Sequence, residues 1–175
     1  VIVSCIDSRT SPEIILDAGL GDLLTIRIAG NITSPEIIGS VEMAVRKIGA
    51  KLIVVMGHSN CGAVFAAVKQ VKEGTMGSVT SKIDRAILQC CPSHAAIDAT
   101  DPQLMNRITR HNVKNSIEEI LEQSTYLKER VLKGEVGIVG ACYYTDSGMV
   151  NFEDDGTDSL SRQDDYQPDS QPALA

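Results

Sequence analysis

Two short segments far apart in the chain carry the side chains that are best suited to chemistry. The first contains Cys5, Asp7 and Arg9 in the pattern C-x-D-x-R. The second contains His58 and Cys61 in the pattern H-x-x-C. Two thiolates and one imidazole bind zinc well, and a set of three such ligands leaves a fourth coordination position for water or substrate. Together the two segments predict a catalytic zinc site.

Asp7 and Arg9 have a clear use beside such a site. A bound zinc ion lowers the pKa of a water ligand to about 7, so that hydroxide is available at neutral pH. Asp7 lies two residues from a predicted ligand, and Arg9 can hold its carboxylate by two hydrogen bonds. We expect Asp7 either to accept the proton of the zinc-bound hydroxide and orient it, or to become a fourth zinc ligand.

Strands of a parallel sheet are expected to position both segments. Residues 1–5 are strand-like, and the apolar run at residues 52–56 is typical of a strand buried on both faces. A further strand is predicted at residues 23–28. The carboxyl ends of neighbouring parallel strands meet at one edge of a sheet, where open α/β folds place their sites. Cys5, His58 and Cys61 are therefore predicted to meet there.

Helices are predicted between these strands, which indicates a sheet with right-handed crossovers. Ser-Pro-Glu occurs at residues 11–13 and again at residues 34–36, and this tripeptide favours a helix start. The first helix should be short, because Gly19 and Gly21 follow it. The second should end at Gly49, and a third is predicted to start at Ala63.

The second half of the chain has weaker patterns. No regular element is predicted from Gly74 to about Asp101, whereas residues 112–132 have helical periodicity. Residues 135–144 are predicted to form a last strand, followed by a turn at residues 145–148 and a hairpin partner at residues 149–152. We expect residues 1–153 to form one domain. Residues 154–175 are acidic and poor in apolar side chains, so we expect a disordered or loosely draped tail.

Composition excludes several classes of protein. The formal net charge of −7 argues against a nucleic-acid surface, which needs a basic face. No apolar run approaches the roughly 18 residues that span a membrane, and nothing resembles a signal peptide. Five unevenly spread cysteines suit a reducing compartment, such as the cytoplasm or an organelle stroma or matrix. The chain begins directly with strand-like residues, so we expect further residues upstream of Val1.

The two segments resemble the two signature motifs of β-class carbonic anhydrases, C-I-D-S-R at residues 5–9 and H-S-N-C-G at residues 58–62. The similarity continues to about Phe152 through R-I-A-G-N at residues 27–31 and G-A-C-Y at residues 140–143. It also includes the helix at residues 39–45 and the pair Asn112-Val113. The resemblance implies an α/β fold with a mostly parallel sheet, in the order 2-1-3-4 with an antiparallel fifth strand, flanked by helices.

The resemblance also implies an activity. It is the reversible hydration of carbon dioxide to bicarbonate and a proton, by attack of zinc-bound hydroxide. By resemblance, Cys5, His58 and Cys61 hold the Zn2+ ion and Asp7 and Arg9 form the catalytic dyad. The family further implies a homo-oligomer, a dimer or a tetramer with the site at the dimer interface.

Some positions depart from the family pattern. Leu24 and Met43 stand where some relatives place a pocket Phe and Tyr, and Ile28 replaces a frequent Asn, so the pocket should be apolar but less aromatic. Arg27 and Tyr143 match two residues of a non-catalytic bicarbonate site in some relatives, but the chain has no Trp for the third position. The N-terminal helices and a pocket glutamine of the family would lie before Val1. The predicted substrate pocket consists of Leu24, Ala29, Gly30, Met43 and Gly62.

Three other functions remain open. A cysteine phosphatase needs an Arg six positions after its Cys, where this chain has Ser11, so this class is disfavoured. A non-catalytic zinc protein with a closed site would use Asp7 as a permanent fourth ligand. A hydrolase of carbon disulfide or carbonyl sulfide could use the same scaffold and the same metal ligands.

The remaining cysteines and histidines have simpler interpretations. Cys90, Cys91 and His94 suggest a second metal site, but adjacent cysteines rarely bind one zinc ion together, so a loop packed by small thiols is favoured. Cys142 is predicted to lie in the core of a strand. His111 is a polar residue at a predicted helix start or, less favoured, a proton shuttle.

Overall fold

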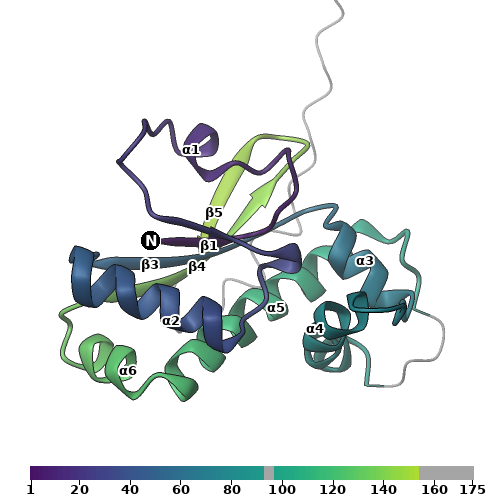
Figure 1. Ribbon diagram of the computed structural model, residues 1–175. Coiled ribbons are helices and arrows are strands. Elements are labelled where there is room, and N and C mark those ends of the chain that lie inside the picture. Colours follow the sequence, from purple (N-terminus) through teal and green to yellow (C-terminus); the bar gives the residue numbers. More distant parts are fainter. Residues whose placement is uncertain (93–96, 154–175) are drawn as a thin grey trace, which may run out of the picture.

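The protein forms one five-stranded sheet with helices around it (Figure 1). The computed structural model describes residues 1–92 and 97–153, so the predicted tail at residues 154–175 lies outside the described residues. The strand order is β2-β1-β3-β4-β5; the first three pairings are parallel and the last is antiparallel. The predicted fold class and sheet order are confirmed. The strands are β1 (Ile2–Ser4), β2 (Thr25–Arg27), β3 (Leu52–His58), β4 (Gly137–Tyr144) and β5 (Met149–Glu153).

The helices follow the strands in the expected alternation in the first half of the chain. Both Ser-Pro-Glu segments start a helix, and Ser34 caps the second by accepting a hydrogen bond from the Ile37 amide. That helix continues through one wider turn, η2, and ends at Gly49, whose φ of 87° few other residues adopt. The elements are α1 (Pro12–Ile15), η1 (Ala29–Asn31), α2 (Pro35–Met43), η2 (Ala44–Ile48), α3 (Gly62–Val68), α4 (Met76–Cys90), α5 (Pro102–Gln123) and α6 (Thr125–Leu132).

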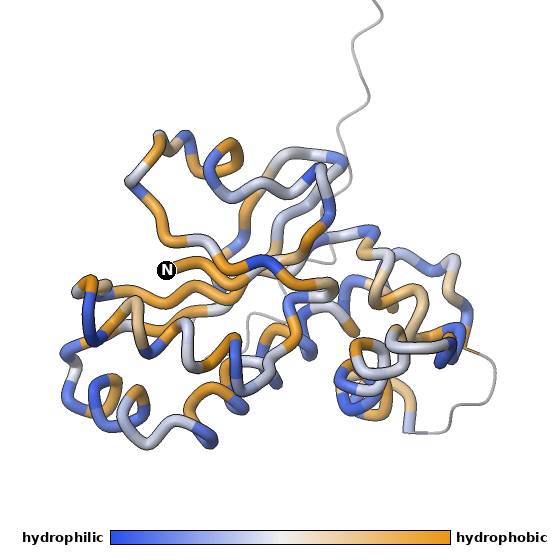
Figure 2. The backbone as a smooth tube through the Cα atoms, viewed as in Figure 1, coloured by the Kyte–Doolittle hydropathy of each residue, from blue (hydrophilic) through white to orange (hydrophobic). Residues whose placement is uncertain are grey.

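The two faces of the sheet have separate apolar cores. Helices α2, α5 and α6 cover one face, where Val3 and Val55 pack with Ile120 of α5. On the other face, Val54 packs against the short α1 segment through partly buried residues such as Ile15. Successive strand residues point to opposite faces, so neighbouring residues serve different cores. Figure 2 shows the resulting hydrophobic strands at the centre of the molecule.

A third core lies beyond the carboxyl ends of β1 and β3, where α3 and α4 pack beside α5 (Figure 1). It contains fully buried side chains of α4 and α5, such as Ile83 and Ile108. Cys5 and Cys61 belong to the same cluster. The two thiols at the sheet edge are therefore surrounded by apolar side chains of this core.

Helix α5 approaches β3 closely because residue 57 is a glycine. A Cβ at Gly57 would lie only 2.8 Å from methyl carbons of Thr109 and Val113 on the helix. This close packing lets the Asn112 side chain donate a hydrogen bond of 2.7 Å to the Gly30 carbonyl. The segment after β2 is thereby held next to the end of β3.

Two predictions about the second half of the chain are wrong. The region predicted as irregular contains the 15-residue helix α4, whose buried face includes Thr80 as well as Ile83 and Ile87. The Thr80 hydroxyl donates to the Val71 carbonyl, so a polar residue lies where an apolar residue would have revealed the helical period. Cys90 is the last residue of this helix and does not lie in a loop.

The predicted helix at residues 112–132 consists of two helices. Asp101 caps α5, accepting hydrogen bonds from the Gln103 and Leu104 amides, so α5 begins ten residues earlier than expected. Ser124 interrupts the run and caps α6. His111 consequently lies inside α5 and not at a helix start. No helix of residues 1–92 and 97–153 is long and apolar enough to cross a membrane.

Candidate metal centre

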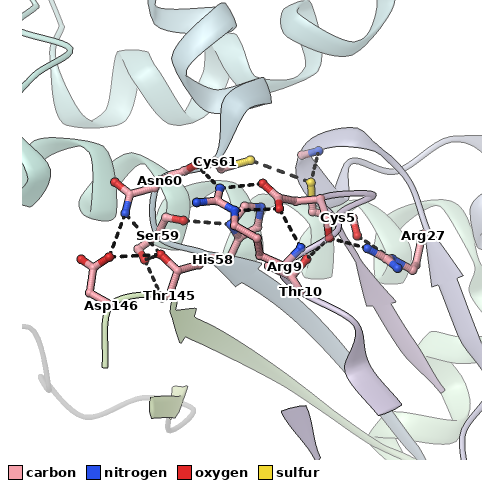
Figure 3. Close-up of polar contacts among 12 residues, drawn as sticks. Cys5, Arg9, Thr10, Arg27, His58, Ser59, Asn60, Cys61, Thr145 and Asp146 are labelled. Carbon is pink, nitrogen blue, oxygen red and sulfur yellow. Dashed lines mark hydrogen bonds and ion pairs between the residues drawn. The ribbon is translucent and has the colours of Figure 1, made fainter. Parts of the chain in front are cut away.

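Cys5, His58 and Cys61 meet at the carboxyl edge of the sheet, as their spacing predicts. Cys5 follows β1, His58 is the last residue of β3, and Cys61 precedes α3. Their candidate ligand atoms all lie within 4.8 Å of one another, and the two sulfurs are 4.0 Å apart (Figure 3). The three residues are between 1% and 4% exposed. This is the arrangement of a Cys2His site formed by three separate pieces of chain.

The orientation of the His58 ring fits a metal ligand. Its Nδ1 lies 2.8 Å from the Ser59 carbonyl oxygen, which requires a proton on Nδ1. Nε2 is then the unprotonated nitrogen, and it is buried without a hydrogen-bond partner among the described residues. An unsatisfied buried polar atom costs about 1–3 kcal/mol. A cation bound to Nε2 and the two sulfurs would remove that cost, and zinc suits this donor set.

The surroundings of the sulfurs favour a thiolate. The Gly30 amide donates a hydrogen bond of 3.3 Å to the Cys5 sulfur. The Cys61 thiol, directed at the same sulfur, lowers the pKa of Cys5, whereas donation to Cys5 and burial raise the pKa of Cys61. Backbone amides at the start of α3 favour the thiolate of Cys61. The surroundings thus favour the thiolate at Cys5 and the thiol at Cys61.

Gly30 can occupy its position only because it lacks a side chain. Its φ is 66°, and a Cβ would lie 3.0 Å from both the Ala63 Cβ and the Ile83 Cδ1. The residue is thus wedged between α3 and α4 with its amide directed at Cys5. Its predicted importance gains a structural reason, which is the close approach of backbone to a sulfur.

Asp7 and Arg9 form the expected doubly hydrogen-bonded pair. Arg9 donates from Nε to Asp7 Oδ1 at 3.0 Å and from Nη2 to Asp7 Oδ2 at 2.7 Å, and its backbone amide also donates to Oδ1. These hydrogen bonds hold the pKa of Asp7 well below its usual range. Arg9 Nη2 also donates to the Asn60 carbonyl at 3.2 Å, which links the two motifs. Asp7 is not among the residues whose ligand atoms lie within 4.8 Å of one another.

Arg27 is a residue of the site whose contacts the sequence did not reveal. Its guanidinium donates to the Cys5 carbonyl at 2.8 Å and to the Asp7 carbonyl at 2.5 Å. The Asp7 carbonyl also accepts from the Thr10 hydroxyl at 2.9 Å. Because Arg27 faces Ser4 in the β1–β2 register, the end of β2 supports the loop that carries Cys5 and Asp7. The sequence indicated Arg27 only through its place in the R-I-A-G-N motif and through the expected parallel pairing of these strands.

The predicted pocket residues do not all lie near Cys5, His58 and Cys61. Gly30 donates its amide to Cys5, Ala29 precedes it, and Gly62 follows Cys61 as the first residue of α3. Leu24 lies at the opposite end of β2, where its carbonyl accepts from the Ile2 amide. Met43 is 62% exposed at the end of α2. A pocket role for Leu24 or Met43 stays a prediction.

The other cysteines and histidines are separate from this centre. Cys142 is buried in β4, as predicted, and burial raises its pKa to about 12. Cys90 and Cys91 are half-buried against the cluster that α3, α4 and α5 form, and His94 lies outside the described residues. His111 is half-buried in α5, and burial lowers its pKa.

Comparisons with known proteins agree with this geometry. The carbonic anhydrase family model matches residues 1–150. Carbonic anhydrase 2 of Mycobacterium tuberculosis is 34% identical over 156 residues, covering 88% of this chain and 73% of the relative. The mitochondrial β carbonic anhydrase 6 of Arabidopsis thaliana is 29% identical over 159 residues, covering 82% of this chain and 52% of the relative.

Solved structures show the same fold. The β-carbonic anhydrase CafA of Aspergillus fumigatus superposes with a TM-score of 0.77 at 25% identity, covering 87% of this chain and 74% of that one. One of two tetrameric β-carbonic anhydrases of Sordaria macrospora gives a TM-score of 0.76 at 24% identity, covering 86% and 78%. Sequence and structure together show that the chain belongs to the β-class carbonic anhydrases, a family of enzymes.

Proposed function

We propose that the protein catalyses the zinc-dependent, reversible hydration of carbon dioxide to bicarbonate and a proton. The observation that carries this proposal is the convergence of two buried sulfurs and an unpartnered imidazole nitrogen beside an arginine-held carboxylate. Membership of the family supports the same reaction. Cys5 Sγ, Cys61 Sγ and His58 Nε2 would hold the metal. When bound, zinc supplies acidity that makes a hydroxide available from water at about pH 7.

Asp7 is proposed to act as the hydrogen-bond acceptor that orients the attacking water. Arg9 engages both carboxylate oxygens and keeps Asp7 ionised. Oδ1 accepts two hydrogen bonds from Arg9 and Oδ2 accepts one, so Oδ2 keeps a lone pair that can accept a hydrogen bond from the water. That hydrogen bond would direct a lone pair of the water towards the substrate carbon. Because Arg9 occupies Asp7, we favour this use of the carboxylate over ligation of the metal as a fourth ligand.

The substrate is proposed to lie against small residues at the sheet edge. Carbon dioxide is apolar and small, so it needs close backbone approach more than specific hydrogen bonds. Gly30 donates its amide to Cys5, Ala29 precedes it and Gly62 follows Cys61, and Ile28 packs against the apolar cluster that contains both cysteines. Carbon disulfide and carbonyl sulfide are likewise small and linear, and selectivity among the three substrates depends on which of them can reach the site.

We further propose that the protein is a homo-oligomer, a dimer or a tetramer. The relatives from Sordaria macrospora are described as tetrameric. On this chain, large apolar residues of α1, of the turn that follows it and of β5 are exposed, namely Ile14 (82%), Leu20 (104%) and Phe152 (53%). Light scattering coupled to size-exclusion chromatography should give a mass of two or four chains, and a single-chain mass would contradict the proposal.

All five cysteines are free thiols, and we propose that the protein works in a reducing compartment such as the cytoplasm. A cell fraction that contains the protein only in an oxidising compartment would contradict this assignment. The proposal follows from the chemistry of the sulfurs, because a thiolate must stay reduced to bind a metal.

A stopped-flow assay of carbon dioxide hydration tests the proposed activity, with carbonyl sulfide hydrolysis as the comparison. Freshly purified, reduced protein should contain about one zinc ion per chain and should hydrate carbon dioxide. Hydrolysis of carbonyl sulfide without carbon dioxide hydration would assign the protein to the related hydrolases. Bound zinc with neither activity would indicate a non-catalytic zinc protein.

A further inference from the structure

The loop between the two ligands of the second motif is fastened to the turn that joins β4 and β5. The Thr145 amide donates to the Ser59 hydroxyl oxygen at 2.9 Å, and the hydroxyl oxygens of the two residues are 3.0 Å apart (Figure 3). Thr145 lies 86 positions from Ser59 in the chain. A residue without any ligand atom in the centre is thus joined directly to the loop that carries His58 and Cys61.

Ser59 transmits this attachment to the imidazole. Its amide donates to the Tyr143 carbonyl at 2.9 Å, and its hydroxyl is held by Thr145. Its carbonyl oxygen then accepts the Nδ1 proton of His58 at 2.8 Å. Ser59 and His58 are 3% and 1% exposed, so water has little access to replace these contacts. The direction of the Ser59 carbonyl decides which way the ring presents Nε2.

The Thr145 hydroxyl also contacts Asn60, which in turn contacts Arg9 of the Asp7–Arg9 pair. Asn60 has a φ of 56°, in the left-handed region. Its side-chain amide donates to Thr145 Oγ1 at 3.2 Å and to Asp146 Oδ1 at 3.3 Å. Its carbonyl accepts from Arg9 Nη2. The turn therefore stabilises an unusual backbone conformation whose carbonyl contacts the arginine that holds Asp7.

The hydrogen bonds of Thr145 Oγ1 form one consistent set. The oxygen can accept from the Asn60 amide and from the Ser59 hydroxyl, and it can donate its own proton to Asp146 Oδ1 at 3.3 Å. The Ser59 oxygen accepts from the Thr145 amide in return. Every donor thus has an acceptor, which is the condition under which a polar network fixes a conformation.

We propose that Thr145 is a positioning residue for the metal centre, acting through Ser59 on His58 and through Asn60 on Arg9. The inference rests on the proposed function for its effect on catalysis, whereas its effect on metal binding can be measured independently. Residues that orient a metal-ligating histidine commonly contribute about 10- to 100-fold to metal affinity or activity.

The test uses two substitutions of Thr145 that differ in one group. Thr145→Val keeps the shape and removes the hydroxyl, whereas Thr145→Ser keeps the hydroxyl. Zinc affinity is measured by competition with a chromophoric chelator, and the site is examined by the absorption spectrum of the Co2+-substituted protein. Thr145→Val should weaken zinc binding about 10-fold or more and change the Co2+ spectrum. Thr145→Ser should have the zinc affinity and the Co2+ spectrum of the unmodified protein.

Ser147→Ala is the matched control, because Ser147 lies in the same turn and its hydroxyl oxygen accepts only from the Met149 amide, at 3.4 Å, among the hydrogen bonds seen in the described chain. It should bind zinc like the unmodified protein. If Thr145→Val does not fold, Ser59→Ala interrupts the same connection from the other side and should weaken zinc binding similarly. Unchanged zinc affinity and an unchanged Co2+ spectrum in a folded Thr145→Val or Ser59→Ala variant would overturn the proposal.

The outcomes separate this inference from the proposed activity. If the unmodified protein binds zinc and hydrates carbon dioxide while Thr145→Val behaves identically, only the positioning of the ligands by Thr145 is refuted. If Thr145→Val weakens zinc binding but the unmodified protein does not hydrate carbon dioxide, the positioning stands and the proposed activity fails.

Discussion

Two regions of the protein each contain a buried cysteine and a carboxylate, and they lie on either side of β3. The pKa values of their groups are shifted in opposite directions. Cys5 with Asp7 lies at the carboxyl edge of the sheet, whereas Cys142 with Glu153 lies within β4 and β5. Both cysteines are almost fully buried, at 4% and 1% exposure. Hydrogen bonds lower the pKa of Cys5 and of Asp7. Burial raises the pKa of Cys142 to about 12 and raises that of Glu153.

The difference shows that burial alone does not determine thiol chemistry. Cys5 receives the Gly30 amide and faces Cys61 and His58, because the strand has ended and free backbone donors surround it. In β4, the backbone groups around Cys142 are engaged by β3 and β5. A buried thiolate needs hydrogen-bond donors, and within a sheet the backbone amides are already paired with neighbouring strands. A metal site with thiolate ligands is therefore favoured at the sheet edge, where some amides are free.

Substitution of one cysteine in each region should give the largest difference in zinc content and activity. Cys61→Ala removes one of three proposed ligands, so zinc and carbon dioxide hydration should both be lost. Cys142→Ala should keep one zinc ion per chain and full activity, with a loss of stability of about 1 kcal/mol. Elemental analysis of both purified variants decides the matter, and zinc retained in Cys61→Ala would contradict the ligand assignment.

The two carboxylates should differ almost as strongly. Asp7→Asn should retain zinc and lose activity by about 10²–10⁴-fold, because the neutral amide is a weaker hydrogen-bond acceptor for the water and cannot bind Arg9 through two oxygens. Glu153→Gln should hydrate carbon dioxide at the normal rate. Stopped-flow rates for both variants, with zinc content measured in parallel, test this contrast. Equal rates would remove Asp7 from the mechanism.

Gly30→Ala tests whether the hydrogen bond from the amide of residue 30 to Cys5 accounts for the difference between Cys5 and Cys142. Its positive φ and the contacts of 3.0 Å with Ala63 and Ile83 should cost about 1–3 kcal/mol of stability and displace the amide from Cys5. Zinc should dissociate faster from this variant. Gly148→Ala is a suitable control, because Gly148 also has a positive φ but nothing lies within 4 Å of its Cβ position. Equal zinc dissociation from both variants would show that strain alone is responsible.

The smallest expected effect concerns stability and pH. The pKa of Glu153 is raised in the folded protein, so its carboxyl favours folding when protonated, and this contribution disappears as pH rises through the folded pKa. Glu153→Gln should therefore be more stable than the unmodified protein at neutral pH and lose that advantage below about pH 4. Denaturant titrations at several pH values provide the measurement. A constant difference across pH would contradict the pKa direction.

Much of this organisation could be predicted, because it depends on local patterns. The apolar run at residues 52–56 and the strand-like residues 1–5 predicted that Cys5, His58 and Cys61 meet at one sheet edge. Ser34 and Gly49 bound a helix as expected. Helix α4 was missed because Thr80 stands on its buried face, and Ser124 was not recognised as a cap between two helices.

The contacts that support the site were harder to predict because they depend on the folded arrangement. Arg27 contacts carbonyl groups 20 and 22 positions away, and Thr145 contacts Ser59 at a separation of 86. Neither contact leaves a periodicity or a motif in the sequence. Residues that supply ligand atoms can be inferred from their chemistry, whereas residues that orient them require the sheet register.

The distance along the chain between Cys5 and Cys61, 56 positions, has a thermodynamic consequence. An unfolded chain cannot keep these thiols together without a large loop-closure penalty, so zinc should bind the folded protein far better than the unfolded chain. Folding and metal binding are then linked equilibria. Above the dissociation constant, each tenfold rise in free zinc should add about 1.4 kcal/mol to the free energy of unfolding. The melting temperature of this protein should thus report the zinc concentration around it.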